Sequence, residues 1–258
     1  MELQFVRRVA MGEDTAQRVR AAAEEHGVRL SAHAPYYINF NSKDPAKVEA
    51  SRARLLHAAR VAHGCGARNV VFHAGYYHDD QPALVYRRIR AHLASLAAQL
   101  RDEGTGVCLR PETMGKGSQF GDLREVLQLA AEVDGVAPCI DFGHLYARAT
   151  GGVNRYDEFA AILEQIRRHL GEHGLQDLHI HLQGMAYTQA GERKHLNLAE
   201  SGLRYKELVR ALADYDVSGT VICESPSLEK DALLLKRAYR GARKAAQSLQ
   251  RNHQLTNP

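Results

Sequence analysis

The chain has 258 residues, of which 45% are hydrophobic and 25% are charged, and it carries a formal net charge of +4. This composition is typical of a globular protein and excludes a disordered or collagen-like chain. No apolar run approaches the roughly 20 residues that span a bilayer, so we expect no contact with a membrane. The four cysteines form no CxxC pair, and we expect them to be reduced core residues of a cytoplasmic protein.

Short apolar runs alternate with amphipathic stretches along the whole chain. The apolar runs predict strands at 3–6, 28–33, 68–73, 106–112, 137–141, 178–181 and 219–224. The stretches between them predict helices at 13–26, 45–64, 81–103, 122–133, 156–170, 203–214 and 228–248. Strict alternation of strands and helices, with strands that are apolar almost throughout, predicts a parallel sheet covered on both faces.

This alternation is typical of a parallel barrel or of a doubly wound sheet. We expect a single α/β domain over residues 1–258, of the (β/α)8 TIM type if the sheet closes into a barrel. A basic helix or tail is expected at about 240–258. A closed barrel of this type needs eight βα units, whereas seven can be found in this sequence. The sequence therefore supplies one βα unit fewer than a closed barrel of this type requires.

Six of the seven predicted strands end at a residue type that binds metal ions. These residues are His33, His73, Glu112, Asp141, His181 and Glu224. In a βα barrel the carboxyl ends of all strands open on one face, so residues far apart in the sequence converge there. Imidazoles and carboxylates without cysteine suit Zn²⁺, with Mn²⁺ or Fe²⁺ as alternatives. More than four ligands implies more than one ion, and Glu112 or another carboxylate is expected to bridge two of them.

His179 stands two residues before His181 in the same predicted strand, so the two side chains share one face. We expect His179 to hydrogen-bond to metal-binding residues rather than to bind an ion itself.

Seven motifs that contain these residues occur in one order along nearly the whole chain. They are SAHAPYYINFNS (31–42), VVFHAGYY (70–77), RPETMGKGSQFG (110–121), CIDFGH (139–144), LHIHLQG (178–184), KHLNLAESG (194–202) and ICESP (222–226). With these motifs the chain resembles the endonuclease IV family of apurinic/apyrimidinic (AP) endonucleases, and specifically its shorter archaeal-type branch. The family belongs to the xylose-isomerase-like superfamily of TIM barrels.

The resemblance implies a (β/α)8 barrel with a cluster of two or three zinc ions that cleaves duplex DNA 5′ to abasic sites by attack of a zinc-bound hydroxide. It implies that His33, His73 and Glu112 hold one ion, and that Glu112 bridges to a second. The second ion would also be bound by Asp141, His181 and Glu224. His144 and His195 would belong to a third ion, and Glu112 and Glu224 would orient or deprotonate the attacking water.

The resemblance also implies a DNA-binding surface around the first histidine. Tyr36 and Tyr37 occupy the loop whose aromatic or apolar side chain enters DNA at the lesion in family members, although two tyrosines packed at the barrel mouth are an equal alternative. Arg7 and Arg8 are expected to contact phosphate. We expect the protein to act on DNA as a monomer.

The sequence departs from the family at three points. An Asp that binds the third ion in other members is replaced by Arg193, with Glu192 as the nearest acid. That ion is therefore expected to be bound weakly, bound through Glu192, or absent. The first βα unit has no counterpart, and the DNA-wedging loop after the second strand is reduced to residues 6–14.

Two other functions are compatible with the sequence. The first is a sugar isomerase or epimerase of the same superfamily, which would use one divalent ion and a small polyhydroxylated substrate. Arg193 and the short loop favour it, whereas the additional histidines favour the nuclease. The second is a non-catalytic DNA-binding barrel, which predicts the loss of more ligands than the one missing here.

Overall fold

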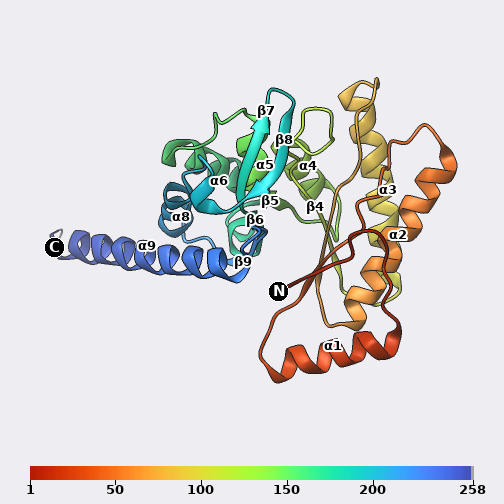
Figure 1. The fold of residues 1–258 in the computed structure, drawn as a ribbon, viewed down its shortest axis with the longest axis horizontal. Helices are drawn as coiled ribbons and strands as arrows, with labels where there is room; N and C mark the ends of the chain where they lie inside the picture. The colour runs from red at the N-terminus through yellow and green to blue at the C-terminus, as the bar shows by residue number, and fades with distance from the viewer. Residues whose placement is uncertain (257–258) are drawn as a thin grey trace. The chain divides into compact units, whose positions relative to one another are not determined.

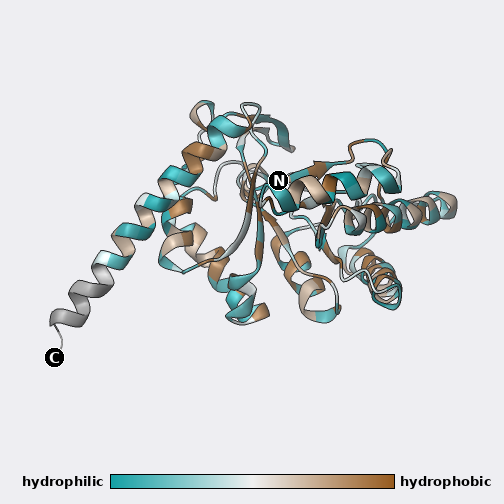
Figure 2. Cartoon of the chain, turned by 90° about the horizontal axis from the view of Figure 1, so that it is seen from below, coloured by the Kyte–Doolittle hydropathy of each residue, from teal (hydrophilic) through white to brown (hydrophobic). Residues whose placement is uncertain are grey.

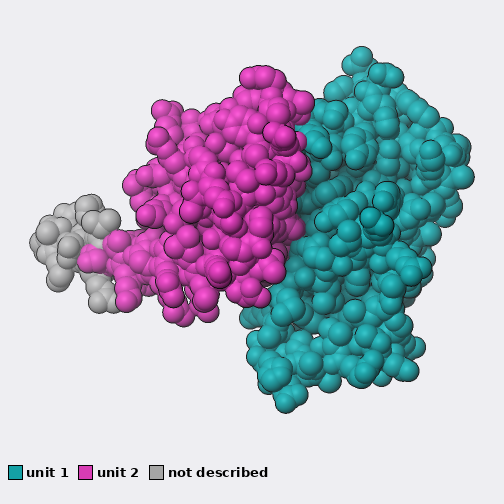
Figure 3. Space-filling model, in the orientation of Figure 1, with its two compact units in different colours: residues 1–139 teal, residues 140–258 magenta. Residues whose placement is uncertain are grey.

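The structure is a computed structural model that describes residues 1–256, with side chains described as far as residue 248. It divides into two compact units, Met1–Cys139 and Ile140–Pro258 (Figure 3). Both units combine strands with helices, as the alternating sequence pattern predicts.

The first unit consists of four βα pairs (Figure 1). Its strands are β1 (Glu2–Gln4), β2 (Ser31–His33), β3 (Asn69–Phe72) and β4 (Cys108–Pro111), and its helices are α1 (Glu13–Glu25), α2 (Pro45–Gly64), α3 (Pro82–Asp102) and α4 (Leu123–Glu132). The four strands are hydrogen-bonded in the order β1-β2-β3-β4, and every pair is parallel. Beyond β4 the segment before Cys139 continues the parallel order, with bridges from Leu109 to Val136 and from Glu112 to Cys139.

Local sequence signals explain where the helices of this unit begin and end. Asp44 caps α2 by accepting a hydrogen bond from the backbone N–H of Ala46 at 2.9 Å, and Pro45 occupies the first turn, where no N–H is needed. The helix ends before Gly66, whose φ of +82° is costly for other residues. Asp122 and Glu125 form a reciprocal capping box at the start of α4.

The core of the first unit lies between these helices and the strands. Val70, Phe72 and Leu109 are buried on the strands, and they belong to one apolar cluster with Leu55 of α2 and Leu93 of α3. Burial of large aliphatic and aromatic side chains is the main favourable term in folding, so this cluster fixes the strands that carry the predicted ligands.

The second unit contains a three-stranded sheet in the order β5-β6-β9 and an antiparallel hairpin. Its elements are β5 (Cys139–Asp141), α5 (Phe142–Arg148), α6 (Tyr156–Leu170), α7 (His173–Gln176), β6 (Leu178–Leu182), β7 (Gly184–Thr188), β8 (Gly191–Leu196), a 3-10 turn (Leu198–Glu200), α8 (Tyr205–Asp214), β9 (Gly219–Cys223) and α9 (Glu229–Thr256). Phe142 and Phe159 pack edge to face at 5.9 Å between ring centres and anchor α5 against α6.

Each of the seven strands of the two larger sheets overlaps one of the seven predicted strands, which agrees with the predicted α/β architecture. The sequence pattern does not predict the short helices α5 and α7, the β7–β8 hairpin or the 3-10 turn at Leu198–Glu200. The prediction of one barrel domain over the whole chain stays a prediction.

Helix α9 includes residues 240–256 of the basic tail predicted at about 240–258. Hydrophilic residues alternate with apolar ones along it (Figure 2). The side chains after residue 248, and residues 257–258 altogether, lie outside the described part of the chain. Among the described residues no helix has the length and apolar character needed to cross a membrane.

Candidate metal centre

The first cluster of predicted ligands lies in the first unit, where three neighbouring parallel strands end. His33 is the last residue of β2, His73 follows β3, and Glu112 follows β4. Nε2 of His33 and Nε2 of His73 lie 3.3 Å and 3.0 Å from Oε2 of Glu112. Two ligands of one zinc ion, each at about 2.0–2.1 Å from the metal, stand roughly 3.3 Å apart. These three side chains therefore have the spacing of a single metal site.

Hydrogen bonding fixes which nitrogen of His33 faces Glu112. Nδ1 of His33 lies 2.8 Å from the backbone oxygen of Ala34. A carbonyl oxygen can only accept, so Nδ1 carries the proton and donates it. The lone pair of the neutral ring is then on Nε2, which faces the carboxylate. His33 and Glu112 are both buried, and a buried carboxylate needs a compensating positive charge.

The predicted DNA-binding tyrosines stand beside this cluster. The ring of Tyr36 stacks on His73 at 5.6 Å between ring centres and meets the edge of His33 at the same separation. Tyr36 is nevertheless 48% exposed and Tyr37 61% exposed. Tyr36 therefore both packs on His33 and His73, two of the predicted ligands, and presents part of its ring to solvent.

A cavity of about 350 Å³ opens behind the two tyrosines, and Tyr36, Tyr37, Tyr76, Lys47 and Arg54 contribute to its lining. The predicted phosphate contacts, Arg7 and Arg8, follow a residue that is hydrogen-bonded to Tyr36. The backbone N–H of Tyr36 donates to the oxygen of Val6 at 3.1 Å, and the exposed Arg7 and Arg8 follow directly.

Asp141 and His144 are joined in the second unit by the start of α5. Asp141 ends β5 and caps α5, because its Oδ1 accepts from the backbone N–H of His144 at 2.7 Å. Oδ2 of Asp141 also lies 3.2 Å from Nδ1 of His144. Gln183 donates from Nε2 to both carboxylate oxygens, at 2.9 Å and 3.1 Å. Asp141 thus orients the His144 ring, as carboxylates do for metal-binding histidines.

The other side of the His144 ring is directed at the β7–β8 hairpin. Nε2 of His144 lies 3.5 Å from Oε2 of Glu192. His144, Glu192 and His195 each place one potential ligand atom within 4.8 Å of the others. Nδ1 of His195 lies 3.1 Å from the backbone oxygen of Glu224, so it donates its proton and leaves the lone pair of the neutral ring on Nε2.

A further pair joins the ends of β6 and β9 in the second unit. Nδ1 of His181 lies 3.5 Å from Oε2 of Glu224. His181 is fully buried, whereas the side chain of Glu224 is 16% exposed. His179 is also buried on β6, with its ring centre 5.5 Å from that of His181. These positions are compatible with the predicted ligand roles of His181 and Glu224 and with a supporting role for His179.

The structure thus brings the predicted residues together within each unit. The predicted bridging of two ions by Glu112 stays a prediction. Sequence reasoning names Glu192 as one possible ligand of the third ion, and it does not single out Gln183. The turn residues Gln189-Ala190-Gly191 between two short runs are a signal for the hairpin that carries Glu192.

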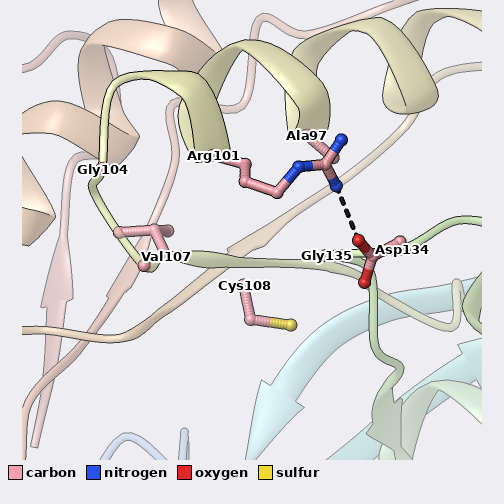
Figure 4. Close-up of a pocket in the computed structure, with 8 residues that line it drawn as sticks. Ala97, Arg101, Gly104, Val107, Cys108, Asp134 and Gly135 are labelled. Carbon is pink, nitrogen blue, oxygen red and sulfur yellow. Dashed lines mark hydrogen bonds and ion pairs between the residues drawn. The ribbon is translucent and has the colours of Figure 1, made fainter.

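Another cavity, of about 410 Å³, lies at the amino end of β4 rather than at its carboxyl end (Figure 4). It is lined by Ala97, Arg101, Gly104, Gly106, Val107, Cys108, Asp134 and Gly135, and Arg101 pairs with Asp134 at 2.6 Å. None of the predicted site residues lines it. In barrels of this type the amino ends of the strands contribute to stability rather than to chemistry.

Parallel βα units with imidazole and carboxylate side chains at the carboxyl ends of the strands define a (β/α)8-type barrel protein, with candidate metal ligands at those strand ends. A family model described as "Xylose isomerase-like TIM barrel" matches residues 1–251. The chain belongs to this family, and the predicted fold class is confirmed.

Individual relatives indicate more specifically which members of this family the chain resembles. An uncharacterized protein of Methanocaldococcus jannaschii is 46% identical over 239 residues, which cover 93% of this chain and 86% of that protein. A protein named probable endonuclease 4 from Mycoplasma pneumoniae is 26% identical over 213 residues, or 79% of this chain and 71% of the relative. The resemblance to endonuclease IV proteins is thereby confirmed.

Solved structures show the same fold. Endonuclease IV from Thermus thermophilus superposes with a TM-score of 0.69 at 22% identity, over 93% of this chain and 85% of that one. A D-tagatose 3-epimerase-like protein superposes with a TM-score of 0.73 at 16% identity, over 96% and 90% of the two chains. At these identities the likeness concerns the fold, which hosts both kinds of protein.

Proposed function

We propose that the protein is a zinc-dependent phosphodiesterase that cleaves duplex DNA on the 5′ side of abasic sites. The observation that carries this proposal is the pair of imidazole–carboxylate clusters. One contains His33, His73 and Glu112, and the other contains His144, Glu192 and His195. A sugar isomerase with one ion has no use for both clusters, whereas phosphodiester cleavage by several ions needs them.

The donor chemistry of both clusters fits zinc. Each offers two neutral imidazole nitrogens and one carboxylate, and the cysteines of the chain stand outside both. Asp141, His181 and Glu224 of the second unit would hold a further ion. When bound, the ions would lower the pKa of a coordinated water and neutralise charge on the phosphate. Mn²⁺ or Fe²⁺ could occupy the same donors.

The carboxylates have distinct tasks in this proposal. Oε2 of Glu112 faces two imidazoles at 3.0 Å and 3.3 Å, so Glu112 would help to hold the first ion and would orient the attacking water. Glu224 retains partial access to solvent, and its carboxylate can therefore accept the proton that the water loses. His179 supports the His181 ring from the same strand.

The DNA surface of this proposal is formed by Tyr36, Tyr37, Arg7 and Arg8. The exposed tyrosine rings would stack on bases beside the lesion, and the two guanidinium groups would contact phosphates. A duplex that contains an abasic site is thus the proposed partner, bound by a monomer in the cytoplasm.

The proposal is tested by incubating the purified protein with a duplex that carries one abasic site, with and without a strong chelator. We expect one nick 5′ to the lesion, its loss with the chelator, and its recovery when zinc is added back. The same duplex with an intact base is the control. An uncut lesion in the presence of protein that binds two or more zinc ions per chain would refute the nuclease.

The same preparation distinguishes the two alternative functions. Turnover of a ketose by protein that holds a single ion would identify a sugar isomerase or epimerase. Binding of duplex without turnover of either substrate would identify a non-catalytic DNA-binding barrel. For the nuclease we also expect an affinity for DNA that falls steeply as the salt concentration rises.

A further inference from the structure

The β7–β8 hairpin contains one residue more on β8 than its partner strand can pair. Met185 lies opposite His195 and Ala186 opposite Lys194, but the next residue, Tyr187, lies opposite Glu192. Arg193 therefore has no partner across the ladder, and the register shifts between Ala186 and Tyr187. One unpaired residue in one strand of an antiparallel pair is a β-bulge.

The bulge decides which acid lies on the face of His195. In a regular strand, residues three apart point to opposite faces, so Glu192 would be turned away from His195. Met185 and Tyr187 are two apart on β7 and share a face. Directly opposed residues of two paired strands point to the same face of the sheet. His195, opposite Met185, and Glu192, opposite Tyr187, therefore share a face as well. The extra residue thus reverses the position of Glu192.

Contacts around the hairpin direct three potential ligand atoms at one another. His144 and His195 each have Nδ1 engaged, by the Asp141 carboxylate and by the backbone oxygen of Glu224. Each ring therefore presents Nε2 to a metal, and Oε2 of Glu192 lies 3.5 Å from Nε2 of His144. Glu192 is only 21% exposed at its side chain, while Arg193 is exposed.

We propose that the bulge at Arg193 makes Glu192 the third ligand of a divalent metal ion that is also bound by His144 and His195. This inference rests on the proposed metal-dependent function and adds to it the residue that completes the site. Two imidazoles and one carboxylate satisfy a zinc ion with a coordination position left open. The acid that the sequence lacks at position 193 is supplied from position 192 by a change of register.

The first test counts metal ions rather than products. Wild-type protein and the Glu192→Gln variant are stripped with a chelator, reloaded with zinc, and weighed by native mass spectrometry. We expect Glu192→Gln to hold one ion fewer per chain, or to bind that ion at least about tenfold more weakly, since even the loss of an indirect partner weakens metal sites by about 10–100-fold. The matched control is Lys194→Ala, which alters an exposed neighbour on the opposite face and should bind as wild type does.

Deletion of Arg193 tests the role of the bulge itself. Without this residue the strand pairs regularly, and Glu192 stands two positions from His195, on the same face. We therefore expect the deletion variant to keep the ion, while Glu192→Gln in the deletion background should lose it. Thermal unfolding of each variant checks that the hairpin still folds. Loss of the ion from a deletion variant that melts like wild type would overturn the role assigned to the bulge.

Failure of this inference can be told from failure of the proposed function. If Glu192→Gln binds as many zinc ions as wild type, with equal affinity, then Glu192 is not a ligand, whether or not the protein cleaves DNA. If instead Glu192→Gln loses an ion but wild-type protein leaves abasic DNA uncut, then the site stands and the nuclease activity does not.

Discussion

The two imidazole–carboxylate clusters are built in different ways. His33, His73 and Glu112 stand at the ends of three adjacent parallel strands, so the regular pairing of β2, β3 and β4 brings them together. His144, Glu192 and His195 come from a helix start and a bulged hairpin. The first cluster depends on repeated backbone geometry, and the second depends on one irregular residue. A strand-end pattern can therefore be found in a sequence, whereas a register shift cannot.

The largest loss of activity is expected when the carboxylate of the first cluster is removed. Glu112→Gln takes away the charge that faces both His33 and His73. We expect cleavage of abasic DNA to fall by at least about 10³-fold, because a loss of about 4 kcal/mol of transition-state stabilisation has that effect. The measurement is single-turnover cleavage with zinc present. Glu103→Gln, at an exposed ion pair with Arg60, is the control. Activity that survives Glu112→Gln would disprove its assigned role.

Asp141 contacts His144 of the second cluster and also caps α5, so substitutions at Asp141 can separate a structural role from a chemical one. Asp141→Asn retains an oxygen for the His144 N–H, so the cap of α5 should persist, since Asn and Asp cap helices about equally. Cleavage should nevertheless fall by about 10–100-fold or more, because the charge that orients His144 is lost. Asp141→Ala should in addition lower stability by about 1 kcal/mol through loss of the cap, measured by denaturant unfolding. Equal stability of the two variants would show that the cap is unimportant.

The exposed tyrosine beside the first cluster should affect DNA binding and leave the metal in place. We expect Tyr37→Ala to weaken binding of abasic duplex by about 1–3 kcal/mol, the usual contribution of stacking on a base. Its zinc content should equal that of wild type, because Tyr37 is 61% exposed and no predicted ligand depends on it. Fluorescence anisotropy of labelled duplex, together with metal analysis, checks both halves. An unchanged affinity would show that Tyr37 only packs at the rim.

The smallest effects are expected from the arginines after β1. Replacing Arg7 or Arg8 by alanine should weaken binding about equally for damaged and intact duplex. Each replacement should lower the slope of log affinity against log salt by about one if the residue contacts a phosphate. Arg18→Ala on α1 is the control for the loss of an exposed charge. Slopes equal to that of wild type would show that these arginines do not contact phosphates of the DNA.

Much of the fold could be predicted because it is repetitive. Each of the seven predicted strands overlaps a strand of the two larger sheets, and the helix predicted at 156–170 has those bounds in the structure. Such strands are apolar almost throughout, and most are followed by a polar residue at the same edge of the sheet, which is a signal that survives without a structure.

The remaining parts depend on contacts that a linear pattern does not contain. Helix α5 is not predicted from the sequence, because Asp141 is recognised there only as the end of a strand. In the structure Asp141 is also the N-cap of the helix that follows. The direction of the Glu192 side chain is not predicted either, because it depends on the pairing register of the strand. In the structure Glu192 pairs with Tyr187 after a register shift. The role of Gln183 becomes visible only through its contact with Asp141.

The stacking of Tyr36 on His73 has an optical consequence. The natural chain has no tryptophan, so Tyr36→Trp would give it a single indole in contact with a histidine of the first cluster. The emission of that indole would respond to any change in the charge or position of the His73 ring. Titration of this variant with zinc would then report the filling of one chosen site by fluorescence, in real time and without a substrate.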